Sequence, residues 1–473
     1  MAPEGTWQIR ELKDCATWYS GGTPSRAVAA YWNGEIPWIS AKSLVDFYVG
    51  ESEECVTEEG ARNGTRVVPK NTILFVVRGM SLKSEFRIGL TTRRVAFNQD
   101  LKALVAKDGI SATFLAYAIR ACTEQILGFV GEAGHGTGVL PTDRMQSLAI
   151  ALPAYELQVQ IGRVAQALDF KIALNRRINQ TLEAMAQAIF KSWFVDFDPV
   201  KAKIAAKAEG RDPLRAAMSA ISGKTDAELD ALPPEQHAQL ATTAALFPDE
   251  IEESELGEIP KGWMSSTLGG LCRTYGGLIQ TGPFGSQLHA HDYTTEGIPV
   301  VMPQDLSGRR ICIDKVARVD ESDAKRLHRH RLQAGDIVFS RRGDVGRHAL
   351  VTPREFGWLC GTGCLLVRPS TEAKISAYVS CALAQAESLE WLTRHAVGAT
   401  MPNLNTTILS NLPIVLPPSA VLTGLQDRLD AMEATKNLFV GETEILAELR
   451  DTLLPKLLSG ELSLSTREAE AIA

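Results

Sequence analysis

The stretch DFKIALNRRINQTLEAMAQAIFKSWFVDFDP, residues 169–199, is the most regular part of this sequence. It carries an apolar residue at nearly every helical turn and holds no Gly or Pro before its last residue. The pattern predicts one helix that reaches back to about residue 155. At about 1.5 Å per residue this helix would measure roughly 60 Å, twice the width of a small domain. Pro199 is expected to end it, because proline cannot continue a helix.

A seven-residue repeat runs along this predicted helix and recurs near the C-terminus. Its members are Ile161, Leu168, Asn175, Leu182 and Ile189 in the first helix and Leu425, Met432, Phe439, Leu446 and Leu453 in the second. The two sets differ throughout by 264 positions. The spacing predicts a coiled-coil seam, in which the polar Asn175 fixes the register at some cost in stability. The alternative is that each helix is only amphipathic and packs on its own domain.

Matching segments also occur outside the helices. The pairs are GEIPWISAKSL (34–44) with EGIPVVMPQDL (296–306), NTILFVVRG (71–79) with GDIVFSRRG (335–343), and Leu152-Pro153 with Leu416-Pro417. Their common order and their shift of 262 to 264 residues indicate a duplication rather than chance similarity between unrelated domains. In each copy short β-rich runs precede a helical segment, at 111–127 and at 375–396, which predicts an α/β (mixed α+β) domain.

The duplication divides the chain into five segments. They are a first globular domain (1–152), a first spacer helix (153–198), a partly helical acidic linker (199–260), a second globular domain (261–416) and a second spacer helix (417–460). If the spacer helices pair antiparallel, an approximate twofold axis relates the two domains. The predicted fold is therefore two mixed α/β domains in pseudo-twofold repeat, separated by two long antiparallel coiled-coil helices.

Charge is distributed unevenly along the 473 residues, whose net charge is −7. The linker stretch PDEIEESELGEIP (248–260) holds six acidic residues and no basic one. Residues 261–370 hold 15 Lys and Arg against 10 Asp and Glu, so this region is basic enough to meet a phosphate backbone. No apolar run is long enough for a membrane span, and MAPEGTWQIRELKD (1–14) lacks the apolar core of a signal peptide. Together with eight scattered cysteines, these features predict a cytoplasmic protein.

Polar and basic side chains gather near the ends of the predicted strands, several of them in glycine-containing loops. The candidates for contact with DNA are Lys42, Arg78, Lys83, Gln304, Arg341, Arg342 and Arg347. Arginine in such a loop suits contact with a phosphate or bidentate readout of guanine. The alternative interpretation is that these loops are solvated hairpin turns.

Candidate metal ligands do not form a convincing set. Cys360 and Cys364 are four residues apart, but no second close pair of Cys or His completes a zinc site. His289 and His291 alternate as expected for a surface strand rather than for a ligand pair. Asp196 and Asp198 are interpreted as residues that end a helix before proline. The sequence therefore predicts no metal site.

Catalytic motifs are absent from the sequence. It contains neither the N/D-P-P-Y/F tetrapeptide nor the F-x-G-x-G turn of adenine methyltransferases, and no G-x-x-x-x-G-K-S/T phosphate loop. The glycine-rich GEAGHGTGVLP (131–141) follows a predicted helix rather than a strand, so it is expected to be a connecting loop. The chain has features of a DNA reader without a catalytic centre.

The whole chain resembles the specificity (S) subunit of type I restriction-modification systems. The resemblance rests on the twofold repeat and on four segments: 152–199, LFPDEIEESELGEIPKGW (246–263), TGPFGSQLHAHDYTTEGIPVV (281–301) and LRDTLLPKLLSGELSL (449–464). It implies two target-recognition domains, each of which reads one half of a bipartite double-stranded DNA target. It also implies that the spacer helices set the gap between the halves and dock two modification (adenine methyltransferase) subunits.

The same resemblance implies where the chemistry takes place. S-adenosylmethionine, ATP and Mg are expected on partner subunits, with ATP-dependent restriction subunits joining for DNA cleavage, and no cofactor is expected in this chain. Two other functions stay open: a coiled-coil scaffold that tethers proteins without reading DNA, and a single-chain DNA methyltransferase or nuclease. A scaffold would leave DNA unshifted in a gel, whereas a fused enzyme would methylate or cut DNA unaided.

Overall fold

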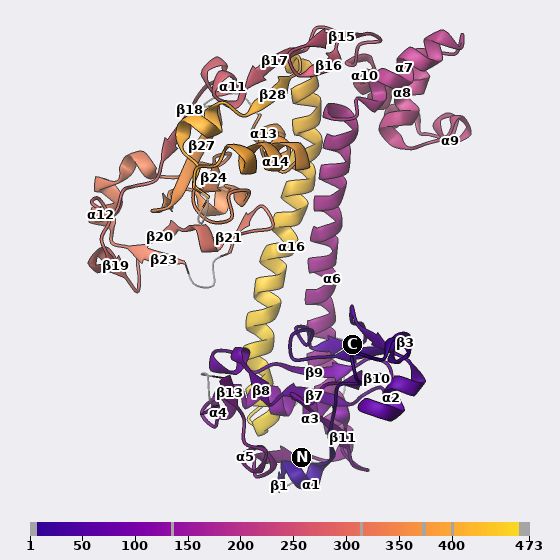
Figure 1. Cartoon of the computed structure of the whole chain (residues 1–473), viewed down its shortest axis with the longest axis vertical. Coiled ribbons are helices and arrows are strands. Elements are labelled where there is room, and N and C mark those ends of the chain that lie inside the picture. The colour runs from indigo at the N-terminus through magenta and orange to yellow at the C-terminus, as the bar shows by residue number, and fades with distance from the viewer. Residues whose placement is uncertain (1–6, 134–136, 313–315, 371–374, 399–401, 463–473) are drawn as a thin grey trace. The chain divides into compact units, whose positions relative to one another are not determined.

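The computed structural model describes residues 7–133, 137–312, 316–370, 375–398 and 402–462. The chain divides into two compact units, drawn in Figure 1. Unit 1 comprises Met1–Arg177 and Phe439–Ala473, and unit 2 comprises Ile178–Leu438. Each unit therefore combines one globular domain with part of both long helices, α6 (Tyr155–Phe194) and α16 (Ser419–Ser459). Among the described helices, none combines the length and the apolar character needed to cross a membrane.

Two sheets form the globular part of unit 1. The larger has the order β2 (Ala16–Ser20), β11 (Leu101–Ala106), β7 (Ile73–Val76), β9 (Ile88–Thr91), β4 (Tyr48–Val49). The other has the order β5 (Cys55–Val56), β3 (Trp32–Ile39), β10 (Val95–Phe97), β6 (Arg66–Val68). Smaller sheets pair β1 (Gln8–Glu11) with β14 (Ala149–Leu152), and β13 (Thr137–Val139) with both β12 (Gly131–Ala133) and β8 (Arg78–Gly79). The helices are α1 (Leu12–Cys15), α2 (Glu58–Gly64), α3 (Ala112–Ala121), α4 (Thr123–Leu127) and α5 (Thr142–Gln146).

Unit 2 repeats the central part of this topology, with different outer strands in both sheets. Its first sheet has the order β18 (Gly276–Thr281), β27 (Cys364–Ser370), β24 (Ile337–Ser340), β25 (His348–Leu350). Its second has the order β19 (Tyr293–Thr294), β23 (Ala317–Val319), β20 (Ile298–Val301), β26 (Leu359–Cys360). Two-stranded sheets join β17 (Met264–Thr267) to β28 (Pro413–Leu416), and β21 (Leu306–Ser307) to β22 (Arg310–Ile311). The helices of the domain are α11 (Leu268–Thr274), α12 (Glu321–Arg326), α13 (Ser376–Leu383), α14 (Ala386–His395) and α15 (Thr406–Ser410).

The segments that match in the sequence occupy equivalent strands. The Ile-Pro segments form β3 and β20, and each pairs in parallel with the short strand that follows the central hairpin, β10 or β26. The two copies of the I-x-F segment form β7 and β24, and each of these strands is third in the order of the first sheet of its unit. The duplication predicted from the sequence is therefore a duplication of structure.

In each unit the main core joins the first sheet to the long helices. In unit 1 the fully buried Phe75, Phe114 and Tyr117 belong to the same cluster as Leu168 of α6 and Leu457 of α16. The unit 2 cluster likewise includes residues from both long helices, at positions 186–194 and 421–429. Burial of apolar area stabilises such contacts by about 25 cal/mol per Å². Each domain is thus packed directly on the helix pair.

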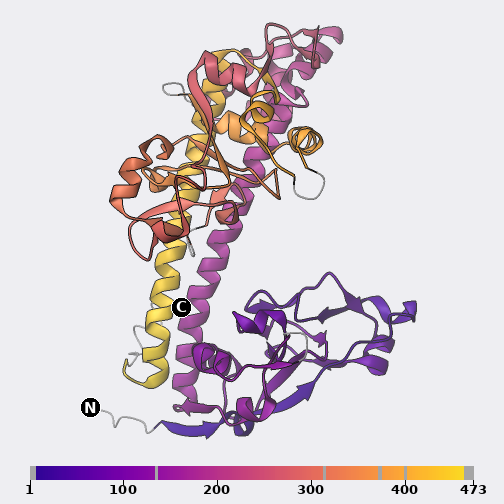
Figure 2. The same ribbon diagram turned by 60° about the vertical axis from the view of Figure 1, so that its left-hand side comes forward.

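The long helices run antiparallel within each unit, as Figures 1 and 2 show. In unit 1, Asp169 of α6 contacts Arg450 of α16, and Asn175, one to two turns later, contacts Glu442. Of the predicted seam residues, Ile161, Leu168, Asn175 and Leu425 are buried, and Leu182, Ile189, Met432, Phe439, Leu446 and Leu453 are half-buried. The fully buried Asn175 donates its amide Nδ2 to Glu442 at 2.7 Å, so the polar seam position bonds to the opposite helix.

The end of α6 differs from the prediction. The helix ends at Phe194, and Phe197 adopts a left-handed conformation with φ of 56°. Pro199 lies in the first turn of the next helix, α7 (Asp198–Ala208). The expectation that Pro199 ends the long helix is therefore wrong, because proline at the start of a helix loses no hydrogen bond. Asp198 accordingly opens a helix, and Asp196 forms an ion pair with Lys191.

The linker contains a small helical bundle. Its further elements are α8 (Pro213–Ser222), α9 (Asp226–Asp230), α10 (Pro234–Ala245), β15 (Ile251–Ser254) and β16 (Gly257–Pro260). Met218, Leu229 and Leu240 form its separate core. The helical segments predicted at 111–127 and 375–396 are each split in two, at Cys122 and at Ala384–Gln385.

Candidate nucleic-acid interface

The loop that connects β24 to β25 carries three of the candidate arginines. The strands on either side pair Phe339 with His348, and the backbone N–H of Ser340 donates to the carbonyl of Arg347 at 2.8 Å. Val345 is buried beneath the loop. The loop is therefore anchored at both ends and in its middle, which holds Arg347 on a rigid support.

A second loop approaches this hairpin from β20. Residues 303–305 form a 3-10 turn in which the buried carboxylate of Asp305 accepts the Met302 N–H at 2.8 Å. Burial raises the pKa of Asp305. The exposed Gln304 projects from this turn, and the Pro303 carbonyl accepts a hydrogen bond from Nη1 of Arg347 at 3.4 Å. Gln304 and Arg347 line one open hollow of about 530 Å³, so the fold brings these two candidates together.

The other two arginines of the hairpin differ in their contacts. Arg341 is half-buried, and its Nε donates to the Asn403 side chain at 3.3 Å. Arg342 is exposed and forms an isolated antiparallel bridge with Asn403 through its backbone. The Arg342 side chain makes no hydrogen bond or ion pair within the described residues, so it is free to reach a ligand.

In unit 1 the exposed Arg78 stands where Arg342 stands in unit 2. It lies in β8 opposite Val139, just as Arg342 bridges to Asn403, and both pairs of positions differ by 264 residues. Carbonyls one residue earlier, of Val77 and of its equivalent at position 341, accept N–H groups at 2.9 and 2.8 Å. The fold thus presents one exposed arginine at the same place in each domain.

This arrangement also revises the expectation for residues 131–141. The described residues of that segment form β12 and β13, and β13 pairs with β8, so the prediction of a simple connecting loop is wrong. Residues 134–136 lie outside the described part of the chain. The hairpin provides the backbone partners that hold Arg78 in place, which a search for phosphate-binding glycine motifs could not reveal.

The remaining candidates of unit 1 lie apart from one another. Lys83 ends the 3-10 turn that follows β8 and forms an exposed ion pair with Glu132 of β12 at 3.2 Å. Lys42 lies on the turn after β3, in an open hollow also lined by Glu51 and Glu54. The structure therefore groups Arg78 with Lys83 but places Lys42 in an acidic setting.

Buried ion pairs that were not identified from the sequence join each domain to both long helices. In unit 1 the carboxylate of Asp169 in α6 accepts bonds from Tyr117 at 2.7 Å, Arg120 at 3.0 Å and Arg450 at 2.6 Å. The side chain of Asp169 is 9% exposed. One carboxylate therefore connects the globular domain of unit 1, α6 and α16, and burial raises the pKa of the Tyr117 hydroxyl that donates to it.

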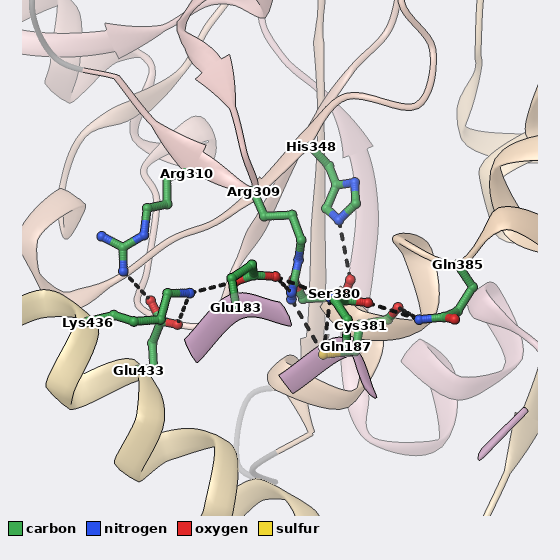
Figure 3. A network of polar contacts seen from close by, with 10 residues as sticks. All are labelled: Glu183, Gln187, Arg309, Arg310, His348, Ser380, Cys381, Gln385, Glu433 and Lys436. Atoms are coloured by element: carbon green, nitrogen blue, oxygen red, sulfur yellow. Dashed lines mark hydrogen bonds and ion pairs between the residues drawn. The ribbon is translucent and has the colours of Figure 1, made fainter. Parts of the chain in front are cut away.

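A similar carboxylate occupies unit 2, where Figure 3 shows Arg309 extending from the β21–β22 turn toward Glu183 of α6. Glu183 bonds to Arg309 and accepts from Nζ of Lys436 in α16 at 2.6 Å. Nη2 of Arg309 also donates to the hydroxyl of Ser380 at 2.6 Å. The arrangement repeats that of unit 1: an acidic residue of α6 lies between a base of the domain and a base of α16.

The network extends along α16. Glu433 accepts from Lys436 at 2.9 Å and from Arg310 at 2.9 Å, so both arginines of the β21–β22 turn bind the helix pair. Beside them the buried ring of His348 stacks on Phe339, and burial lowers the pKa of this histidine to about 4. The imidazole is therefore neutral at neutral pH and supports the hairpin that carries Arg347.

Groups that could hold a metal are few in the described residues. His289, His291 and Asp292 bring ligand atoms within 4.8 Å of one another, on an exposed 3-10 turn rather than on the expected surface strand. The Asp292 carboxylate already accepts the His289 backbone N–H at 2.8 Å. Cys360 and Cys364 are buried in β26 and β27, and a hydrogen bond from the Cys364 thiol to Cys360, together with burial, raises the pKa of Cys364, which disfavours the metal-binding thiolate.

Comparison with known proteins gives a consistent result. A family model described as the type I restriction modification DNA specificity domain matches residues 4–184 and 260–438. The chain is 24% identical over 463 residues to the type I restriction enzyme MjaIX specificity subunit of Methanocaldococcus jannaschii, covering 96% of this chain and 93% of that protein. It is 32% identical over 355 residues to the HindI specificity subunit of Haemophilus influenzae, covering 72% and 75%.

A solved structure shares the fold. It is the S subunit of a type I restriction-modification system from M. genitalium, which aligns over 98% of both chains with a TM-score of 0.53 and 15% identity. The linker bundle at 199–245 lies outside both segments that match the family model.

Proposed function

Because this chain belongs to the family of type I restriction-modification specificity subunits and carries two DNA specificity domains, we propose a division of labour between its parts. The globular domains read the two halves of a bipartite target, and the chain itself carries no catalytic centre. Methyl transfer and cleavage, with S-adenosylmethionine, ATP and Mg, take place on modification and restriction subunits in the cytoplasm. Support comes from the absence of methyltransferase and ATPase motifs in the sequence.

One observation carries the proposed DNA contact. Arg78 and Arg342 are exposed at equivalent positions of the two domains, next to strands that follow the same topology. A duplicated reader should present equivalent cations to two equivalent DNA segments, because phosphate contacts set the orientation of each domain. The other proposed contacts are Lys42, Lys83, Gln304, Arg341 and Arg347.

Arg342→Ala is expected to weaken recognition of the second half-site alone, by about 1 to 3 kcal/mol, and Arg78→Ala to do the same at the first. Binding of the full chain, purified with its modification subunits, is measured on duplexes in which only one half-site is altered. Arg329→Ala removes an exposed arginine elsewhere in the second domain and serves as the control. Equal loss at both half-sites for Arg342→Ala would assign the residue a structural role. If the unaltered protein does not shift any of these duplexes in a gel, the result would favour a coiled-coil scaffold that does not read DNA.

The long helices are proposed to set the gap between the half-sites. Support comes from their continuity: α6 has 40 residues and α16 has 41, and each contributes to both units. An uninterrupted helix has a fixed rise per residue, so the number of its residues sets the distance between its ends. The seam proposed for this spacer consists of the ten heptad positions from Ile161 to Leu453 named above.

Modification subunits are proposed to dock on the outer faces of the same helices. Large apolar side chains that are more than 40% exposed line these faces: Phe170, Leu174, Met185, Leu438, Ile445 and Leu449. Soluble helices rarely expose so many apolar residues unless a partner covers them. The seam does not account for these side chains, since its members are buried or half-buried.

Ile445→Glu is expected to lower the affinity for the modification subunit at least about tenfold, because a charge would be buried in an apolar contact. Ile445 is 67% exposed, so its substitution should leave the unfolding transition of the chain unchanged. Association is measured by titration of the full chain with the purified modification subunit. Glu448→Ala, an exposed position on the next turn, is the control. Unchanged affinity in Ile445→Glu would place the docking surface elsewhere.

A further inference from the structure

The guanidinium of Arg347 is held in place by an acidic neighbour in its own hairpin. Nε and Nη2 both donate to Oδ2 of Asp344, at 3.3 and 3.2 Å, and Nη1 donates to the carbonyl of Pro303 at 3.4 Å. The Arg347 side chain is 40% exposed and that of Asp344 is 62% exposed. The plane of the guanidinium is therefore set by the protein while its outer edge faces solvent.

These bonds leave part of the guanidinium available. A guanidinium carries five N–H groups, of which Asp344 and Pro303 engage three. One N–H on each Nη is left, and two parallel N–H groups of a guanidinium can span the O6 and N7 acceptors of guanine in the major groove. The orientation of the two Nη groups of Arg347, called here the fork, is fixed before DNA binds, so little side-chain entropy is lost on binding.

The surroundings favour a neutral base edge over a phosphate. The carboxylate of Asp344 lies beside the fork and would repel a phosphate, whereas guanine presents uncharged acceptors. Phosphate contact also requires no fixed plane, so it would not need the bonds that Asp344 and Pro303 make to Arg347. Arg347 further lines the hollow that Gln304 shares, and a concave surface of this kind can receive a base edge.

We infer that Arg347 reads the guanine of one G·C pair in the second half-site and that Asp344 positions it for this contact. The inference rests on the proposed DNA recognition by this domain and adds the base that the residue selects. Asp344 acts only through Arg347, whereas Arg347 itself contacts the base. The second half-site of the target therefore contains one G·C pair whose identity depends on this hairpin.

The test selects bound duplexes from a randomised pool with the full chain purified together with its modification subunits. The unaltered protein should enrich a bipartite motif with a fixed G·C pair in the second half. Arg347→Ala should lower the preference at that single position by about 5- to 150-fold and leave all other positions unchanged. Arg347→Lys, which keeps the charge but not the fork, should lose a similar preference.

Variants of Asp344 distinguish positioning from direct contact. Asp344→Ala should reduce the preference at the same position by a smaller factor, and adding it to Arg347→Ala should cause no further change. Arg329→Ala, the matched loss of one exposed positive charge, should leave the motif intact. Uniform weakening at every position in Arg347→Ala, or full preference in Arg347→Lys, would overturn the inference but not the proposed function. Failure of the unaltered protein to enrich any bipartite motif would overturn the proposed function itself.

Discussion

Replacing Glu183 by Leu is expected to lower the free energy of unfolding by about 3 to 5 kcal/mol, because it leaves the largely buried Arg309 without its counter-charge and Lys436 with Glu433 alone. The side chains of Arg309 and Lys436, which both bond to Glu183, are only 17% and 7% exposed. Neither can regain full hydration without moving the second domain off the helices. Denaturant unfolding of the full chain measures the effect.

Two further variants separate this cause from general disturbance of the helix. The double variant Glu183→Leu with Arg309→Met should recover most of the lost stability, since Lys436 keeps Glu433 as a partner at 2.9 Å. Asp427→Ala removes an exposed carboxylate from α16 and should change stability by less than about 0.5 kcal/mol. A double variant less stable than Glu183→Leu would show that the ion pair is not the source of the loss.

The same carboxylate predicts a pH dependence. Burial raises the pKa of Glu183, but the charges of Arg309 and Lys436 outweigh this effect and lower the pKa to about 2. A carboxylate whose pKa is depressed in the folded state stabilises the protein above its unfolded pKa of about 4.5 and loses this contribution as pH falls toward 2. The stability difference between the unaltered protein and Glu183→Gln should therefore shrink between about pH 4.5 and pH 2.

Inserting four helix-favouring residues, such as Glu-Ala-Ala-Lys, into both spacer helices is expected to move binding to a target with a longer gap. Four residues add about 6 Å, close to two base pairs at roughly 3.4 Å each. Affinity for the original target should fall at least about 10³-fold, toward that of non-specific DNA, because only one domain can then reach its half-site. Selection from a randomised duplex pool, with modification subunits present, measures both the gap and the half-sites.

The insertion points follow from the pairing of the helices. Insertions after Ile178 in α6 and after Phe439 in α16 fall between the Asn175–Glu442 bond and the Glu183–Lys436 bond, so the bonds within each unit are kept. The two half-sites should stay unchanged. An insertion into α6 alone disrupts the pairing and serves as the comparison for simple damage. Altered half-sites with an unaltered gap would refute the proposal that the helices set the spacing.

Much of the fold could be predicted because it depends on local patterns. The seven-residue spacing from Ile161 to Ile189 is visible in one segment, and it predicted a helix that the structure places at Tyr155–Phe194. The strand predicted at 101–106 is β11 without change of boundary. The predicted end of the first long helix was wrong because proline gives two opposite local signals. It is unfavourable within a helix but favourable at the start of one, and Pro199 occupies the start of α7.

The candidate site was only partly visible for a different reason. Arginines in glycine-containing loops stand out in a sequence, but the partner that orients each one does not. Asp344 lies three residues from Arg347 and could have been noticed, whereas the carbonyl of Pro303 lies 44 residues away. The buried Asp169 and the half-buried Glu183 lie next to the heptad positions Leu168 and Leu182, and neither belongs to a motif that predicts an ion pair.

Periodicity and duplication therefore predicted the two domains and the long helices, and four quoted segments together with the repeat carried the resemblance to the family, because all of these signals are present in the order of residues along the chain. Tertiary packing determined which charged side chains are buried together. Asp169 meets Arg450 across 281 residues and Glu183 meets Lys436 across 253, and such pairs exist only when distant segments fold together. The same packing decided that Arg347 is held by a neighbour while Arg342 is not, because the environment of a side chain depends on everything that surrounds it in space.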